Sequence, residues 1–160
     1  MIKKLLNRSI LLLVFNFVLF STAYSQNTYK FECVSVGNDG FVTLKIWNTK
    51  KGGNYKFEHA CKDAIKAVLY SGVPYNKGCI TQKPILQNQE EQAKFHKIEK
   101  KFFSRNGAWS TYTLTSQSEI AVSGNFGLKN WKAYQISVSK DLLRKFLEDN
   151  NIIKRLNDGF

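Results

Sequence analysis

The stretch that decides the fold is FEHACKDAIKAVLYSGVPYNKGC, residues Phe57 to Cys79. Its apolar residues recur every three or four positions, which is the spacing of one buried stripe on a helix. The stripe consists of Phe57, Cys61, Ala64, Ile65 and Val68. Gly72 ends the helix and Pro74 prevents it from resuming. We therefore predict a core helix over residues 55–71, slim enough at its alanines to lie close to a sheet.

The same stretch raises the question of a metal site, because it holds His59 and Cys61. Residues two apart on a helix do not face each other, so Cys61 belongs to the apolar stripe and His59 to the opposite face. The other histidine, His96, is predicted on the exposed face of a second helix. No CxxC or HxxxH spacing is present, and such spacing is the usual signature of a zinc site. We expect neither a metal site nor a cofactor.

A disulfide is the more common use of cysteine in an exported chain. Three cysteines allow one pair and one free thiol. The first choice is Cys61–Cys79, because the connection after Gly72 is long enough to double back along the helix. The second choice is Cys33–Cys61, in the layer between sheet and helix. Three reduced and buried cysteines are the third alternative.

Alternating apolar and polar residues predict strands on both sides of this helix. Residues 29–36 and 41–47 alternate around the turn sequence GNDG, which is typical of a β-hairpin. Residues 110–116 and 131–138 alternate again, with Tyr112, Leu114, Tyr134 and Ile136 expected to face the core. Residues 118–130 are ambiguous between strand and loop.

Two further helices are predicted. Asn88 and Glu91 resemble a capping box, so the first helix should begin there and run to about Phe103. Ser139 is a suitable N-cap for the second, whose expected core residues are Leu142, Leu143, Phe146 and Leu147. The order ββα-α-ββ(β)-α predicts an α+β fold, with a small antiparallel sheet and two to three helices packed on one face.

The first 25 residues have the layout of a secretory signal peptide. Lys3, Lys4 and Arg8 precede an apolar run, and small residues at positions 23 and 25 suit cleavage before Gln26. The run is shorter than the roughly 20 residues needed to span a bilayer. We therefore expect a signal peptide over 1–25, a single α+β domain over 26–160, and a periplasmic or extracellular location without a stable membrane span after cleavage.

The formal net charge is +12, and it falls to +9 when the three cations of the leader are removed. A basic protein attracts anionic partners such as nucleic acid, lipid headgroups or acidic polysaccharide, although a solvated lysine-rich surface is the simpler interpretation. We name a candidate partner surface from exposed aromatics beside lysines. It consists of Trp109, Trp131, Lys50, Lys51, Lys62 and Lys66. The alternative is that the tryptophans fill the ends of the sheet.

No pattern points to catalysis. There is no G-x-S-x-G sequence, and the paired acids fall at expected helix ends. General acid–base chemistry needs carboxylates whose pKa values a cleft has pushed apart. We therefore predict no catalytic residue and a non-enzymatic protein. A small hydrolase would require a deep cleft that holds His59 or His96 next to a carboxylate.

Two units of the chain form a recognisable pattern. They are FVTLKIW (41–47) with HACKDAIKAVLYSGVP (59–74), and KAYQISVSKDLLRKFLEDNNIIKRLNDGF (132–160), together with PIL (84–86) and the Phe102-Phe103 pair. In these features the chain resembles a group of uncharacterised exported proteins of Bacteroidota. The general shape is similar to small envelope modules such as the N-terminal domain of TolB or FlgT-type domains. The resemblance covers most of the chain after the leader. It implies an envelope or secreted location and a non-enzymatic role, and it carries over no site residue.

These observations lead to three hypotheses. The first is an exported non-enzymatic protein that binds a protein or a cell-envelope component. The second is a binding module for an anionic polymer, such as acidic glycan or nucleic acid. The third is a small hydrolase.

Overall fold

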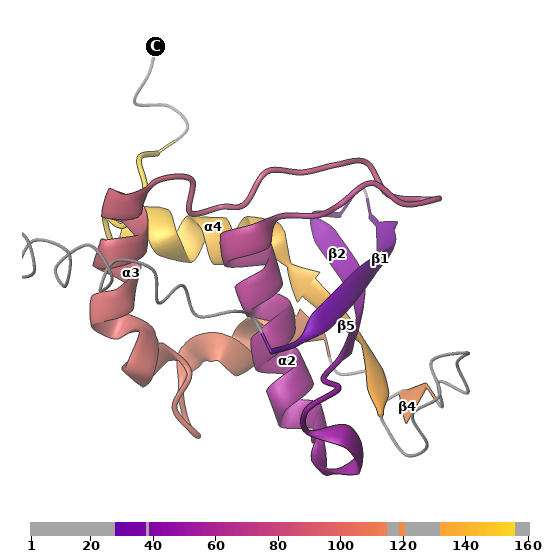
Figure 1. The fold of residues 1–160 in the computed structure, drawn as a ribbon. Coiled ribbons are helices and arrows are strands. Elements are labelled where there is room, and N and C mark those ends of the chain that lie inside the picture. Colours follow the sequence, from indigo (N-terminus) through magenta and orange to yellow (C-terminus); the bar gives the residue numbers. More distant parts are fainter. Residues whose placement is uncertain (1–27, 38, 115–118, 121–131, 156–160) are drawn as a thin grey trace, which may run out of the picture.

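The sheet is antiparallel, and its strands occupy four side-by-side positions, the last of which is shared by two short strands (Figure 1). The computed structural model describes residues 28–37, 39–114, 119–120 and 132–155. Its strands are β1 (Lys30–Val36), β2 (Phe41–Trp47), β3 (Thr113–Leu114), β4 (Glu119–Ile120) and β5 (Ala133–Ser139). They follow the order β1-β2-β5-β3, and β4 also pairs with β5. Both short strands therefore share the outer edge of β5, opposite the edge that pairs with β2.

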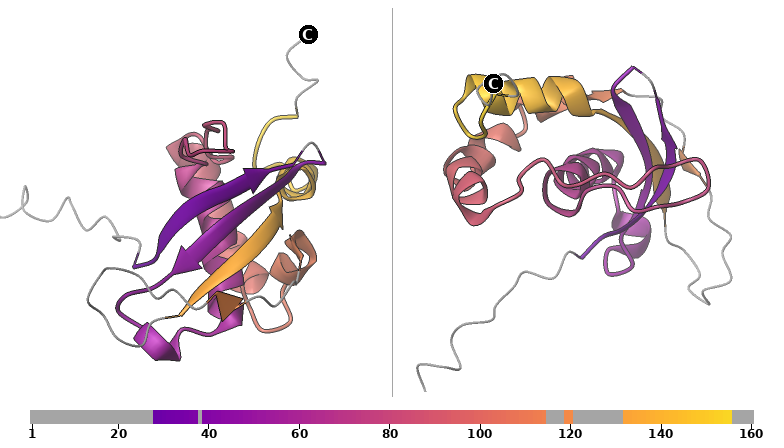
Figure 2. Two further views of the ribbon diagram at one scale, coloured as in Figure 1. Left: turned by 90° about the vertical axis from the view of Figure 1, so that its right-hand side faces the viewer. Right: turned by 90° about the horizontal axis from the view of Figure 1, so that it is seen from above.

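The helices lie on one face of this sheet (Figure 2). They are α2 (Phe57–Lys66), continued by the π-helix η2 (Ala67–Ser71), α3 (Gln89–Phe102) and α4 (Lys140–Asp149). Two short 3-10 helices are η1 (Gly52–Asn54) and η3 (Ala108–Tyr112). The helix α2 packs directly on β2 and β5, and α3 lies on its far side. The predicted α+β class, with helices on one face of an antiparallel sheet, is confirmed.

The core face of the sheet follows the alternation predicted for its central strands. Val42, Leu44 and Ile46 of β2 are at most 1% exposed, and Ile136 and Val138 of β5 are fully buried. The opposite face carries polar residues such as Thr43 and Ser137, whose hydroxyl groups are hydrogen bonded at 2.9 Å. Ala60 and Ala64 are fully buried in the α2 interface, as their small size predicted.

The π-helix η2 determines the path of the chain after α2. Its wider turn closes with the amide of Gly72 donating to the carbonyl of Ala67 at 2.9 Å. The carbonyls of Val68 and Leu69 then accept hydrogen bonds from the amides of Ile85 and Leu86, at 3.2 and 3.0 Å. The returning segment is thus attached to the end of the helix, and the intervening residues project outward as a hairpin.

Cys33 and Cys79 form the disulfide, with Cα atoms 6.2 Å apart. The predicted Cys61–Cys79 pair is wrong, and so is the alternative Cys33–Cys61 pair, because Cys61 is a buried free thiol. The hairpin does not double back along α2. It crosses to β1, where Asn76 Nδ2 donates to the carbonyl of Cys33 at 2.9 Å.

Two local predictions are corrected. Residues 110–112 of the predicted strand 110–116 belong to the 3-10 helix η3, and a strand of only two residues, Thr113–Leu114, follows it. Residues 115 and 116 lie outside the described residues. Thr113 is buried and Leu114 is 54% exposed, the reverse of what was expected for these two residues. Tyr112 packs against the core as predicted. On α4, Leu143 and Leu147 are buried as expected, but Leu142 is 52% exposed because it lies to one side of their stripe.

The leader, Trp131, Leu156 and most of the ambiguous segment 118–130 lie outside the described residues. The signal peptide and the boundaries of the domain therefore stay predictions. In the part of the chain that the structure describes, no helix is both long and apolar enough to cross a membrane.

Candidate functional site

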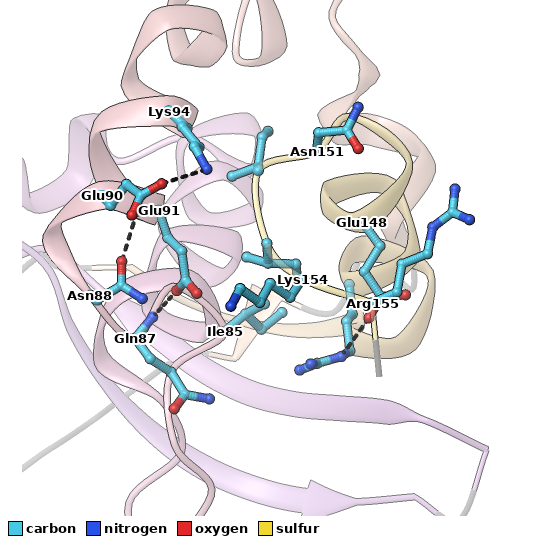
Figure 3. A pocket seen from close by; sticks show the side chains of 13 residues that line it. Ile85, Gln87, Asn88, Glu90, Glu91, Lys94, Glu148, Asn151, Lys154 and Arg155 are labelled. Atoms are coloured by element: carbon cyan, nitrogen blue, oxygen red, sulfur yellow. Dashed lines mark hydrogen bonds and ion pairs between the residues drawn. The ribbon is translucent and has the colours of Figure 1, made fainter. Parts of the chain in front are cut away.

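The candidate site is an open hollow of about 700 Å³ between the start of α3 and the end of α4 (Figure 3). Its volume lies within the range typical of small-molecule pockets. Three isoleucines contribute its apolar part, and each is less than 10% exposed: Ile85, Ile152 and Ile153. The remaining lining residues are polar or charged. We refer to this cavity as the hollow.

One wall of the hollow is the first turn of α3. Asn88 caps this helix by accepting from the amide of Glu91 at 2.9 Å. The carboxylate of Glu91 turns back and accepts from the amide of Gln87 at 2.6 Å. The predicted capping pair is therefore present, although the acid reaches the residue before the cap. Glu90 and Glu91 place two carboxylates in this first turn, so an anionic ligand would find little attraction on this wall.

The opposite wall is built by the C-terminal cap of α4. The amides of Asn151 and Ile152 donate to the carbonyls of Glu148 and Leu147, at 3.0 and 2.9 Å, and Asn151 has a φ of 54°. This pair of bonds is the Schellman arrangement, in which asparagine can replace glycine. The cap turns the chain sharply, so Ile152 enters the hollow and Lys154 and Arg155 follow on its rim.

The charges of the hollow are unevenly paired. Lys94 binds Glu90 at 2.7 Å, and Arg144 binds Glu148 at 3.0 Å. The bond from Lys94 lowers the pKa of Glu90, and the charge of Lys154 acts in the same direction. Among the described residues, Lys154 and Arg155 belong to no ion pair, and both are exposed. In Figure 3, Lys154 lies between the two walls. The hollow therefore offers apolar contact together with two available cations.

The predicted partner surface is not brought together as expected. Trp109 is only 9% exposed, its indole nitrogen donates to the carbonyl of Ser104 at 2.8 Å, and the Lys62 ammonium lies 4.9 Å from its ring centroid. Trp109 is therefore not an exposed aromatic, which agrees with the alternative that the tryptophans are packed into the fold. Trp131 lies outside the described residues.

The four lysines of that surface differ in whether their side chains form ion pairs within the fold. Lys62 pairs with Glu58 at 2.6 Å, and Lys66 pairs with Glu99 of α3 at 3.5 Å. Lys50 and Lys51 occupy the turn after β2, where their amides donate to Asn48 Oδ1 at 3.0 Å each, and both side chains are exposed. The two lysines of α2 are thus engaged within the fold, and the two in the turn point to solvent.

His59 and His96 do not line the hollow. His96 lies on the exposed side of α3, with Nδ1 3.0 Å from a carboxylate oxygen of Glu99. His59 stacks on Tyr55 with ring centroids 6.4 Å apart, and burial lowers its pKa. In the described part of the chain, no three His, Cys, Asp or Glu side chains are grouped so as to hold a metal ion.

Sequence reasoning missed the hollow. The start of α3 was predicted, but nothing in its spacing from the segment IIKR (152–155) shows that the two meet. A usable signal was the Asn-Asn pair at 150–151 followed by two isoleucines and two cations, since this pattern predicts a tight helix end with a buried and then a charged segment. Comparisons with protein-family models, with curated proteins and with solved structures find no match to this chain.

Proposed function

We propose that this chain is an exported, non-enzymatic binding protein whose partner is a protein or a cell-envelope component. In this proposal the hollow receives an anionic, partly apolar segment of that partner. Export is supported by the signal-like leader and by the Cys33–Cys79 disulfide, a bond that persists in oxidising compartments. The proposed resemblance to exported proteins of Bacteroidota agrees with it.

The observation that supports the ligand class is the pair of cations at the end of the described chain. Lys154 and Arg155 stand beside a floor of buried isoleucines, and the neighbouring acids already have partners. A carboxylate next to an aliphatic side chain matches both features. The acids of the hollow do not suit general acid–base work, because Glu90 and Glu148 are each held by a cation and Glu91 accepts from the amide of Gln87.

The test is a binding comparison with matched charge removal. The mature chain and a Lys154→Gln/Arg155→Gln variant are titrated with short peptides that alternate glutamate and isoleucine, and with glutamine analogues of those peptides. We expect the acidic peptides to bind the mature chain, and to bind the variant with an affinity at least about tenfold lower. A tenfold loss of affinity corresponds to about 1.4 kcal/mol of binding free energy. The control is Lys97→Gln/Lys100→Gln, which removes the same charge from α3 outside the hollow. Equal binding by all three proteins would contradict the proposal.

A second function, binding of an anionic polymer, is supported by the outer side of α3. Lys97, Lys100 and Lys101 are all exposed on that helix, and none of them lines the hollow. Counterion release predicts that such binding weakens steeply with salt. The Lys97→Gln/Lys100→Gln variant tests this function. It should lose affinity for acidic polysaccharide or single-stranded DNA, whereas the Lys154→Gln/Arg155→Gln variant should not. That result would favour this function over the first.

A further inference from the structure

The hairpin between α2 and α3 extends away from the hollow and has no part in the function proposed for it. Residues 72–87, which we call the arm, leave the end of η2 and return to it. Amide–carbonyl pairs join Val73 to Gln82, at 2.8 and 2.9 Å, and Asn76 to Cys79, at 3.4 and 2.8 Å. Gly78 occupies the turn with a φ of 96°, which glycine adopts without cost. These two bridges fix the register of the hairpin, with Gly78 in its turn.

The arm is held at several points along its length. The Cys33–Cys79 disulfide and the hydrogen bond from Asn76 to the carbonyl of Cys33 tie it to β1. The Lys140 ammonium donates to Gln82 Oε1 at 2.5 Å, which ties it to α4. Figures 1 and 2 both show the end of the arm extending past the sheet. The fold therefore holds residues 75–80, which we call the tip, in a fixed position beside β1, where Cys79 is buried and the other five residues are exposed.

The tip carries the two most exposed large apolar side chains of the described residues. Tyr75 is 80% exposed and Ile80 is 79% exposed, whereas the next, Leu114, is 54% exposed. The bridged pairs flank them, so Tyr75 and Ile80 occupy opposing positions on the two strands of the arm. An exposed cross-strand pair of this kind adds nothing to the core, and its exposure calls for a partner outside the fold.

The charge around this pair is entirely positive within the arm. Lys77 lies in the turn and Lys83 follows on the return strand, both exposed. Residues 72–89 contain no aspartate or glutamate. A partner that covers the tip should therefore combine an apolar layer with negative charge at its surface.

We propose that the tip inserts into the interface of an anionic lipid bilayer. A bilayer presents negative headgroups above an apolar layer, and lysines near its surface are attracted to the headgroups. Tyrosine favours this boundary because its ring is apolar and its hydroxyl remains hydrated. An apolar anchor together with a basic surface supplies the two signals that reversible membrane attachment requires.

This inference does not depend on the hollow. Ile85 and Gln87, which line the hollow, stand at the base of the arm, and the tip is at its other end. Loss of peptide binding by the hollow would leave the membrane proposal intact, and the reverse also holds.

The test is co-sedimentation of the mature chain with vesicles. One set is phosphatidylcholine alone, and the other is phosphatidylcholine mixed with phosphatidylglycerol. We expect binding to the mixed vesicles, and binding at least about tenfold weaker for Tyr75→Ser/Ile80→Ser, because burial of large apolar side chains is lost. The matched control is Leu142→Ser, which removes an exposed leucine from α4 and should bind as the wild type does. Lys77→Gln/Lys83→Gln should lose the preference for the anionic vesicles.

Folding is checked by thermal unfolding of each variant, which should match the wild type because the replaced side chains are exposed. Equal vesicle binding by the wild type and the tip variant would overturn the proposal. Absence of vesicle binding by the wild type would also overturn it. This includes a result in which the tip binds a protein instead of a bilayer.

Discussion

The hydroxyl of Tyr55 donates a 2.8 Å hydrogen bond to Oδ2 of Asp63, a carboxylate on the second turn of α2. Tyr55 is 1% exposed, and its own carbonyl accepts from the hydroxyl of Tyr134 at 3.0 Å. Strand β5, the segment before α2 and the side of α2 are therefore joined through one tyrosine. This link holds the start of the core helix against the sheet.

We predict that Tyr55→Phe lowers the free energy of unfolding by about 1–3 kcal/mol, the usual cost of leaving a largely buried acceptor without its donor. Urea denaturation of the purified chain measures the change. The control is Tyr75→Phe, in which the lost hydroxyl belongs to a side chain that is 80% exposed. A Tyr55→Phe loss no greater than that of Tyr75→Phe would show that the hydrogen bond makes no net contribution.

Asp63 should make stability depend on pH. Burial raises its pKa above the usual value of 3.8, against the opposing effect of the Tyr55 bond. The folded state then holds this proton more tightly than the unfolded chain does, so the contribution of Asp63 to the free energy of unfolding falls as pH rises from 3.8 through the raised pKa. The lowered pKa of His59 acts in the opposite sense. The contribution of His59 to the free energy of unfolding is lost as pH falls below its ordinary pKa of about 6.5.

The Asp63→Asn variant isolates the carboxyl group, because the amide oxygen still accepts from Tyr55. We expect the stability of the variant relative to the wild type to increase with pH and then to level off once Asp63 is fully ionised. Chemical denaturation at a series of pH values gives this difference directly. A difference that stays constant over the series would contradict the raised pKa.

The parts of the fold that were predictable from sequence are those in which one periodicity applies throughout. The alternation in β2 and β5 identified their buried faces, and the stripe of α2 identified its core side, because each element buries a single face against one neighbour. The prediction failed at residues 110–112, where a 3-10 helix replaces the expected strand, and at Leu114, which is 54% exposed. Alternation over a short segment cannot distinguish these conformations, since both place residues in changing directions.

The disulfide and the hollow were not predictable for a different reason. Both depend on where separate elements meet. Spacing shows that Cys79 can approach either α2 or β1, but the π-turn of η2 and the bonds from Ile85 and Leu86 decide the direction of the arm. Hydrogen bonds between distant backbone groups have no periodic signature in the sequence. The same limit applies to the meeting of α3 with the tail after α4.

The disulfide should be a major source of stability. Cys33 and Cys79 are 46 residues apart, and closing a loop of that length stabilises the folded state by about 4 kcal/mol in the chain-entropy model. We predict a loss of this order for Cys33→Ser/Cys79→Ser, measured by urea denaturation under oxidising conditions. Addition of reductant should then lower the stability of the wild type but leave that of the variant unchanged. An equal response of both proteins would contradict the pairing.

Thiol counting provides an independent check of the same pair. Burial raises the pKa of the Cys61 thiol to about 11, so it should react slowly in the folded protein, because the thiolate is the reactive form. We expect one reactive thiol in the denatured, non-reduced chain, and three after reduction. Peptide mapping should find that the single thiol is Cys61. Labelling of Cys33 or Cys79 without reductant would show that the pairing is wrong.

Gly72 and Gly78 allow the cost of backbone conformation to be separated from the cost of close packing. Both have positive φ, at 74° and 96°. A Cβ added at Gly78 would meet only the carbonyl of Val34 at 3.5 Å, an ordinary contact, whereas a Cβ at Gly72 would collide with the carbonyl of Gln82 and stand 2.8 Å from the nitrogen of Pro84. We predict that Gly78→Ala costs about 1–2 kcal/mol from backbone strain alone. Gly72→Ala should cost clearly more, because the return strand of the arm must also move away from the end of α2. Urea denaturation measures both variants, and equal losses would mean that the arm shifts freely at its base, contrary to the bonds that join Ile85 and Leu86 to η2.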